Sequence, residues 1–366
     1  MGTLSLLPNE TIMAILGHIC LQDAGQHVDN PSDACFQGPR QLKPGQLSWH
    51  CANQLVTLRS LCLVSRRFCC LAQPLLYHDF RIGHGNSGCP KSLSWVGRLE
   101  RFTRTIAARP DLASAVKRVH VHPDLLWAVT EDQARATIEE LVGAAATPEA
   151  ASTIVADYLN HFDAVRTGPP QRAASLRLAG SELLGLLLSL LPNLDSLSMQ
   201  VVPPQGGIPA GALATLADIA PRPGSGTPAP LARLRTLNIC SHSTGRMMFS
   251  LNNHAGGILE TLAANVEGGR LTTLNLHMCS RTRVRIAEGS LRHLKKLRIT
   301  RSRLSAADLA SLLACCAAPG LEEFVYEATR PKRGECEFPK ISPFEGILSP
   351  APPTSYISFW LLADTI

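Results

Sequence analysis

Histidines on a predicted strand are the first residues of this chain whose spacing could support chemistry. His120 and His122 stand two residues apart, so a strand would place both imidazoles on one face, as a metal site or a general base requires. Exposed histidines of a solenoid's concave surface would show the same spacing. We therefore interpret both histidines as exposed residues of a binding surface.

Twelve cysteines raise the question of a metal site or a disulfide framework. No two of them have the Cys-x-x-Cys spacing, and the adjacent pairs Cys69-Cys70 and Cys315-Cys316 lie on predicted helices, where neighbouring side chains diverge by about 100°. His27, Cys35, His50 and Cys51 are too irregularly spaced to indicate zinc. The cysteines are interpreted as small core residues in a reducing compartment, with no metal and no cofactor.

Motifs of the common enzyme classes are missing from the sequence. It has no Gly-rich phosphate loop followed by Lys and Ser or Thr, no Gly-x-Ser-x-Gly and no His-Glu-x-x-His. Paired carboxylates on an identifiable helix are also absent. We therefore expect a protein that is not an enzyme.

A basic cluster in the C-terminal half indicates an acidic or phosphorylated ligand. Its members are Arg281, Arg283, Arg285, Arg292, Lys295, Lys296, Arg298, Arg301 and Arg303. Arginines suit bidentate binding of carboxylate or phosphate, although a solvated surface would have the same composition. The net charge of +6 is modest and aromatic residues make up only 5%, which is little for base stacking, so nucleic acid is not the expected partner.

A short apolar pattern recurs six times and predicts the strands of a sheet. It joins an aliphatic residue, a second apolar residue three positions on and a third two positions later. The copies are Val116-x-x-Val119-x-Val121, Leu194-x-x-Leu197-x-Met199, Leu234-x-x-Leu237-x-Ile239, Leu271-x-x-Leu274-x-Leu276, Leu294-x-x-Leu297-x-Ile299 and Leu321-x-x-Phe324-x-Tyr326. The last two positions of each copy share one face of a strand.

The opposite strand face is predicted to bind the target. Alternation along the strands places eight polar side chains there, able to hydrogen-bond a peptide. They are His120, His122, Ser198, Gln200, Asn238, Asn275, His277 and Arg298.

Helical apolar runs at 181–191 and 305–317 precede two of these strands, each followed by a breaker pair, Pro192-Asn193 and Pro319-Gly320. A parallel solenoid has this order of elements. The pattern resembles irregular leucine-rich repeats, which implies a parallel sheet. The second apolar positions lie 78, 40, 37, 23 and 27 residues apart, and only Cys279 matches the family's Asn or Cys position. A generic α/β domain remains the alternative.

The N-terminal helices carry a second pattern. Leu7-Pro8-x-Glu10 precedes an Ile- and Leu-rich helix with Ile12, Ile15, Leu16 and Ile19 on its expected buried face. Pro74 is expected to end the later helix. That helix contains Leu61-x-Leu63-Val64-Ser65-Arg66-x-Phe68, and Pro74-Leu75-Leu76-Tyr77 follows.

Residues 4–80 resemble an F-box of the type found in filamentous-fungal proteins. The resemblance implies binding to a Skp-family adaptor, and through it to cullin and RING subunits. The matching adaptor-binding positions are Leu7, Pro8, Glu10, Ile12, Ile15, Leu61, Leu63, Val64 and Phe68. A polar insert at about 21–54 departs from the family's short turn. An N-terminal hairpin that only caps the next domain is the alternative.

The expected organisation is an α/β protein: a three-helix F-box at 1–82, a linker loop and helix at 83–115, a leucine-rich-repeat-like substrate domain at 116–330 and an atypical tail at 331–366. The implied function is that of a substrate-recognition subunit of an SCF-type ubiquitin ligase; the alternative is a repeat scaffold without a ligase role. The longest apolar run, 183–191, is shorter than the roughly 20 residues that span a bilayer. Without a signal peptide, a cytoplasmic or nuclear location is expected.

Overall fold

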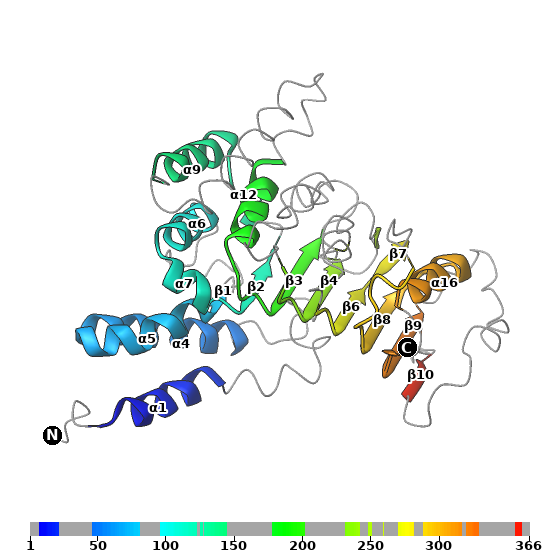
Figure 1. Cartoon of the computed structure of the whole chain (residues 1–366), viewed down its shortest axis with the longest axis horizontal. Coiled ribbons are helices and arrows are strands. Elements are labelled where there is room, and N and C mark those ends of the chain that lie inside the picture. The colour runs from blue at the N-terminus through cyan, green and yellow to red at the C-terminus, as the bar shows by residue number, and fades with distance from the viewer. Residues whose placement is uncertain are drawn as a thin grey trace.

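A computed structural model describes the helices and strands that carry both patterns. It covers residues 7–21, 46–80, 96–122, 125–126, 128–144, 178–201, 231–241, 248–250, 259, 270–281, 288–316, 320–328 and 356–360. Within these ranges the protein is α/β, as predicted. Figure 1 shows N-terminal helices at one end of a long parallel sheet, with further helices above its first strands and one near its far end.

The main sheet has eight strands, and their spatial order follows the chain. All neighbouring strands pair in parallel. The strands are β1 (Asp79–Phe80), β2 (Arg118–Val121), β3 (Ser196–Val201), β4 (Thr236–Ser241), β6 (Thr273–His277), β8 (Lys296–Ser302), β9 (Glu323–Ala328) and β10 (Tyr356–Trp360). A separate two-stranded sheet joins β5 (Phe249–Ser250) to β7 (Cys279–Arg281). The predicted parallel sheet is confirmed, and it also includes β10, from the segment predicted to be an atypical tail.

The six pattern copies align in register across the sheet. Their second apolar residues form one continuous row: Val119, Leu197, Leu237, Leu274, Leu297 and Phe324. Each of these side chains is at most 4% exposed. Burial of the row in one core explains why the pattern tolerates unequal spacing, since loops of different length can join strands whose apolar faces are equivalent.

The same pair of backbone hydrogen bonds recurs at the start of successive strands. The Lys117 carbonyl accepts hydrogen bonds from Asp195 N and Ser196 N, at 2.8 and 3.0 Å. The carbonyls of Asp195, Arg235, Thr272 and Lys295 each accept the equivalent pair from the next strand, at 2.8–3.0 Å. Five successive junctions thus have the same geometry.

Five further helices flank the sheet: α6 (Arg98–Ala108), α7 (Pro110–Ala115), α9 (Glu131–Ala144), α12 (Leu178–Ser189) and α16 (Ala306–Cys315). The predicted runs at 181–191 and 305–317 correspond to α12 and α16. Ser305 caps α16 as its spacing to Asp308 predicts, because Asp308 N donates to Ser305 Oγ at 3.1 Å. α12 packs against α6 and α9.

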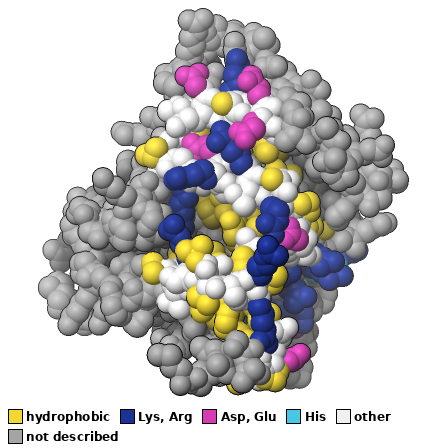
Figure 2. Space-filling view, turned by 90° about the vertical axis from the view of Figure 1, so that its left-hand side faces the viewer, with side chains coloured by type: hydrophobic (Ala, Val, Ile, Leu, Met, Phe, Trp, Pro, Cys, Tyr) yellow, Lys and Arg dark blue, Asp and Glu magenta, His cyan; other side chains and the backbone are white. Residues whose placement is uncertain are grey.

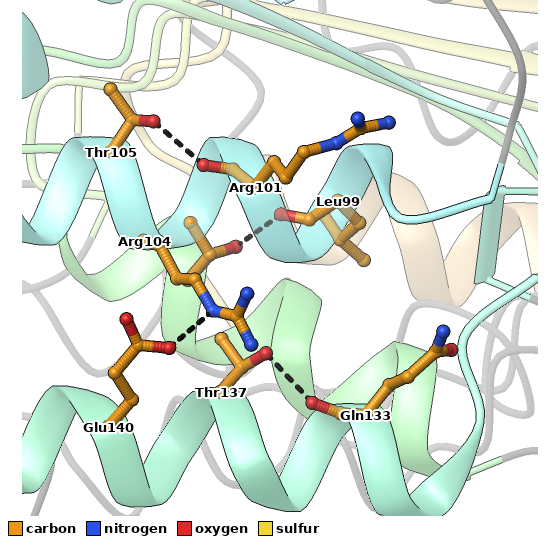
Figure 3. A network of polar contacts seen from close by, with 8 residues as sticks. Leu99, Arg101, Arg104, Thr105, Gln133, Thr137 and Glu140 are labelled. Atoms are coloured by element: carbon orange, nitrogen blue, oxygen red, sulfur yellow. Dashed lines mark hydrogen bonds and ion pairs between the residues drawn. The ribbon is translucent and has the colours of Figure 1, made fainter.

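The contact between α6 and α9 includes an ion pair, from Arg104 Nε to Glu140 Oε2 at 2.8 Å (Figure 3). Thr137 Oγ1 donates to the carbonyl of Gln133 in its own helix at 2.8 Å. Glu100 on α6 differs from these groups. It is 3% exposed, and neither of its carboxyl oxygens has a hydrogen-bond partner in the described part of the chain.

Glu100→Leu is expected to stabilise the protein. A carboxyl group buried without hydrogen bonds costs several kcal/mol, whereas Leu fills a similar volume with apolar contacts. We expect thermal unfolding to shift upward by about 5 °C, at roughly 2–4 °C per kcal/mol. Glu139→Leu, at an exposed position of α9, is the control and should change stability by less than about 0.5 kcal/mol. A lower melting temperature for Glu100→Leu would contradict this expectation.

The N-terminal helices form a unit with its own small core. α1 (Asn9–Leu21), α4 (Gln46–Val64) and α5 (Arg66–His78) enclose a second hydrophobic cluster, separate from that of the sheet. Its buried members are Ile12, Leu16, Leu58, Phe68 and Ala72.

Three details differ from the sequence predictions here. The predicted insert is shorter than 21–54, because α4 already begins at Gln46; residues 22–45 lie outside the described ranges. Pro74 does not end the helix, since α5 continues to His78; Leu75 and Leu76 in that last turn pack against the small core. Ile15 was expected to be buried with Ile12 but is 45% exposed.

Candidate binding surfaces

The α4–α5 elbow is fixed by local capping. Ser65 alone separates the two helices, and its side chain accepts a hydrogen bond from Phe68 N at 3.2 Å. Arg67 then links α5 to the start of α1: its Nε donates to Asn9 Oδ1 at 2.8 Å, and its Nη2 donates to the Leu7 carbonyl. Sequence reasoning did not identify this role of Arg67, because nothing in the spacing connects it with Asn9.

The nine predicted adaptor-binding residues divide into two groups. Ile12 and Phe68 lie in the small core, and Leu7 and Leu61 pack partly buried against it. These four hold the unit together. The others are exposed at the surface: Pro8, Glu10, Ile15, Leu63 and Val64.

Five large apolar side chains of α1 and α4 are exposed, and we call them the elbow patch. Their exposed fractions are Met13 37%, Ile15 45%, Val56 57%, Leu63 80% and Val64 66%. Figure 2 faces this end of the molecule and shows hydrophobic side chains at the surface beside Lys and Arg. Sequence reasoning missed Met13 and Val56, whose exposure depends on how the helices pack. Val56 and Leu63 stand seven residues apart and therefore lie on one face of α4, and exposed apolar groups on one face are a feature of interaction sites.

The polar strand face forms a second candidate surface. His120, Ser198, Asn238, Asn275 and Arg298 lie in one register row across β2, β3, β4, β6 and β8. Gln200 and His277 belong to a neighbouring row. The structure therefore brings most of the predicted target-binding residues together.

Three residues of that row are buried, whereas the alternation predicted an accessible strand face there. Ser198, Asn238 and Asn275 are 5–6% exposed. Asn238 Nδ2 donates to Ser198 Oγ at 2.9 Å, and Asn275 Nδ2 donates to Asn238 Oδ1 at 2.6 Å. Neighbouring strands bring short polar side chains within reach of one another, so both asparagine amides donate within the row, while the buried Asn275 Oδ1 has no hydrogen-bond partner among the described residues. We call these three residues the amide ladder.

His277 is held neutral beside the ladder. Its Nδ1 lies 2.8 Å from Thr300 Oγ1. Burial, and secondarily the Arg301 guanidinium, lower the pKa of His277 to about 4. His120, His122 and Gln200 are half-buried, and each takes part in an interaction within the fold. This face is therefore largely engaged in the protein's own contacts.

The low pKa of His277 predicts a pH dependence of stability. The unfolded side chain has a pKa near 6.5, so the unfolded state binds more protons, and stability is lost as pH falls from about 6.5 to about 4. The loss should approach about 3 kcal/mol, at 1.36 kcal/mol per pKa unit. Urea unfolding at pH 7 and pH 4.5 should show a smaller difference for His277→Gln, which keeps a partner for Thr300. Equal pH differences in both proteins would contradict the assignment.

Carboxylates of β9 and of the residue before it neutralise part of the predicted basic cluster. Lys295 Nζ lies 2.6 Å from Glu322 Oε1, and Arg298 Nε lies 2.7 Å from Glu323 Oε1. Lys296 and Arg301 pair at longer range with Glu323 and Glu327, at 3.7 and 3.8 Å. Arg283 and Arg285 lie outside the described ranges, and Arg292 and Arg303 are exposed. These pairs reduce the positive charge available for an anionic ligand.

In the described ranges, no group of three His, Cys, Asp or Glu side chains is placed to hold a metal ion. Across the same residues, no helix has the length and hydropathy to cross a membrane.

Comparison with known proteins finds no matching family model, no similar curated protein and no similar solved structure. The elbow patch and the polar strand face are therefore the observations from which we infer function.

Proposed function

We propose that this protein is the substrate-recognition subunit of an SCF-type ubiquitin ligase, with a Skp-family adaptor bound to its N-terminal helices. The observation that carries the proposal is the elbow patch, whose apolar side chains are 37–80% exposed. They belong to a unit that already has its own core, so folding alone does not require them to be apolar. A partner that buries them gains about 25 cal/mol per Å² of apolar surface.

The rest of the chain supports a repeat domain. Five identical strand junctions and a sheet in chain order fit a leucine-rich-repeat-like solenoid, in which each unit contacts mainly its neighbours. The target would bind to this array. In the complex the protein would do no bond chemistry; it would raise the local concentration of target lysines near the cullin- and RING-bound conjugating enzyme.

Because the amide ladder is buried, we place the proposed target surface on a neighbouring row of the same strand face. Arg118, Ser196, Thr236, Thr273 and Lys296 stand in register at the strand starts. The first four are half-buried and Lys296 is exposed, so this row is more accessible than the ladder. The hydroxyl groups of this row suit a peptide with carboxylate or phosphate groups, whereas Arg118 and Lys296 at its ends are each paired with a carboxylate, Asp79 and Glu323, at 3.7 Å.

A repeat scaffold without a ligase role is the second candidate. Contacts between the N-terminal helices and the first strands of the sheet favour it. α5 leads directly into β1, which pairs with β2, and the Tyr77 and Phe102 rings stack at 5.9 Å. The N-terminal helices thus join the end of the sheet, as a cap would.

Adaptor binding separates the two candidates. The full-length chain and a purified Skp-family adaptor should co-elute in size-exclusion chromatography and give a 1:1 complex by calorimetry. A cap has no reason to bind the adaptor, so a flat titration at micromolar concentrations would reject the ligase proposal and leave the scaffold.

A further inference from the structure

An exposed arginine stands within the apolar face of α4. Val56 and Leu63 are separated by two turns of this helix, about 10 Å along its axis. Arg59 lies in the turn between them, three residues after Val56 and four before Leu63, so it is a neighbour of both on the helix surface. All three residues are exposed. A partner that covers both apolar side chains therefore also covers the position of Arg59.

A second exposed arginine follows the elbow. Arg66 begins α5 directly after its N-cap, Ser65, and it is exposed. The N-terminus of a helix carries the positive end of its dipole, where a cation is unfavourable. The charge of Arg66 thus opposes the local stability of α5, so its presence is better explained by binding than by folding.

Neither arginine is neutralised within the fold. α4 and α5 contain no Asp or Glu, and in the described ranges Arg59 and Arg66 make no hydrogen bond or ion pair through their side chains. Arg67 differs, because its guanidinium donates to Asn9 and to the Leu7 carbonyl. Figure 2 shows Lys and Arg side chains beside the hydrophobic surface at this end of the molecule. The two exposed guanidinium groups are therefore available to a partner.

A partner surface that is only apolar would not suit these charges. A cation that leaves water without a counter-charge carries a large desolvation penalty, whereas a carboxylate can accept two parallel hydrogen bonds from one guanidinium. Arg59 can also extend its aliphatic stem along Val56 and Leu63 while its charged head reaches the edge of the contact. In both geometries the favourable neighbour is a carboxylate.

We propose that the adaptor surface that covers the elbow patch is acidic, with carboxylates that pair with Arg59 and Arg66 beside the apolar contacts of Val56 and Leu63. This inference rests on the proposed ligase function and specifies the chemistry of the adaptor surface. The apolar side chains supply most of the affinity, and the arginines supply orientation and faster association. Both arginines determine specificity, since a partner without carboxylates would leave their charges unpaired.

Charge reversal in the full-length chain tests the inference. Calorimetry with a purified Skp-family adaptor should show weaker wild-type binding at about 500 mM than at about 50 mM NaCl, because salt screens exposed ion pairs. Arg59→Glu should lower the affinity at least about tenfold at the lower salt concentration, and by a smaller factor at the higher one. Arg59→Lys keeps the charge without the bidentate geometry, so its affinity should lie between the two and keep most of the salt dependence.

Arg66→Glu separates binding from folding. A carboxylate in the first turn of α5 suits the helix dipole, so the melting temperature should be unchanged or higher while the affinity for the adaptor falls. A loss of affinity in a protein at least as stable as wild type cannot result from unfolding. Wild-type affinity in this variant would overturn the assignment of Arg66.

Arg270→Glu is the matched control. It makes the same change in net charge at an exposed residue three positions before β6, outside the N-terminal helices, and should bind the adaptor like wild type at both salt concentrations. The inference is overturned if Arg59→Glu binds within about twofold of wild type, or if Arg270→Glu loses as much affinity as Arg59→Glu. A flat wild-type titration would instead reject the ligase proposal, and this inference with it.

Discussion

Replacing Leu63 and Val64 together with aspartate is expected to abolish adaptor binding while leaving the protein folded. The two side chains are 80% and 66% exposed, so the change should cost less than about 0.5 kcal/mol of folding stability at each site. In a complex, the same positions would bury two unpaired carboxylates at the centre of an apolar contact, a penalty of several kcal/mol. Affinity measured by calorimetry should fall at least about 100-fold, equivalent to about 2.7 kcal/mol.

Two further variants serve as controls for this experiment. Val96→Asp places one aspartate at an apolar residue outside the elbow patch, just before α6 and 60% exposed, and this variant should bind the adaptor like wild type. Phe68→Ala removes a core side chain of the N-terminal unit and should reduce both its stability and its binding. Wild-type affinity in the Leu63 and Val64 double variant would show that the elbow patch does not contact the adaptor.

The choice of residues follows from the structure and not from the resemblance alone. Leu7 and Pro8 begin the F-box-like motif, but Leu7 packs against the small core and its carbonyl accepts a hydrogen bond from Arg67. If variants of Leu7 and Pro8 lost adaptor binding, the loss could result either from unfolding of the N-terminal unit or from a missing contact with the adaptor. Leu63 and Val64 avoid this ambiguity because their side chains are largely outside the packed unit.

The strands were predictable because apolar periodicity reports burial directly. The residues of the Val119–Phe324 row are all apolar and occupy the same position of the recurring pattern, and a parallel sheet is the arrangement that buries them together. The same reasoning failed for Ile15, because an apolar residue at helical spacing does not reveal whether the neighbouring helix covers it. Burial there depends on the packing of α1 against α5.

The amide ladder shows a second limit of periodicity. Alternation placed Ser198, Asn238 and Asn275 on the face opposite the apolar row, and the structure agrees. It does not follow that polar residues on that face are free to bind. These side chains hydrogen-bond one another because the strands pair in a register that places them side by side. The distances along the chain, 40 and 37 residues, do not reveal such contacts. The acidic partners in and before β9 were missed for the same reason.

Asn238→Ala is the second change with a large expected effect. Asn238 is the middle of the ladder: it donates to Ser198 Oγ and accepts from Asn275 Nδ2, with all three side chains buried. Its removal leaves two buried polar groups unsatisfied, at about 1–3 kcal/mol each. Thermal unfolding should shift down by roughly 10 °C, whereas Thr236→Ala, at a half-buried position on the same strand, should have a much smaller effect.

A triple variant distinguishes lost hydrogen bonds from a simple cavity. Replacing Ser198 with Ala and both asparagines with Leu removes every ladder group at once, and exchanging all partners for apolar groups can be nearly neutral. The triple variant should therefore recover most of the stability lost in Asn238→Ala, a non-additivity expected only for residues that act as one network. If the three changes instead add, so that the triple variant is the least stable protein of the set, the ladder is not the unit that specifies this row of the sheet.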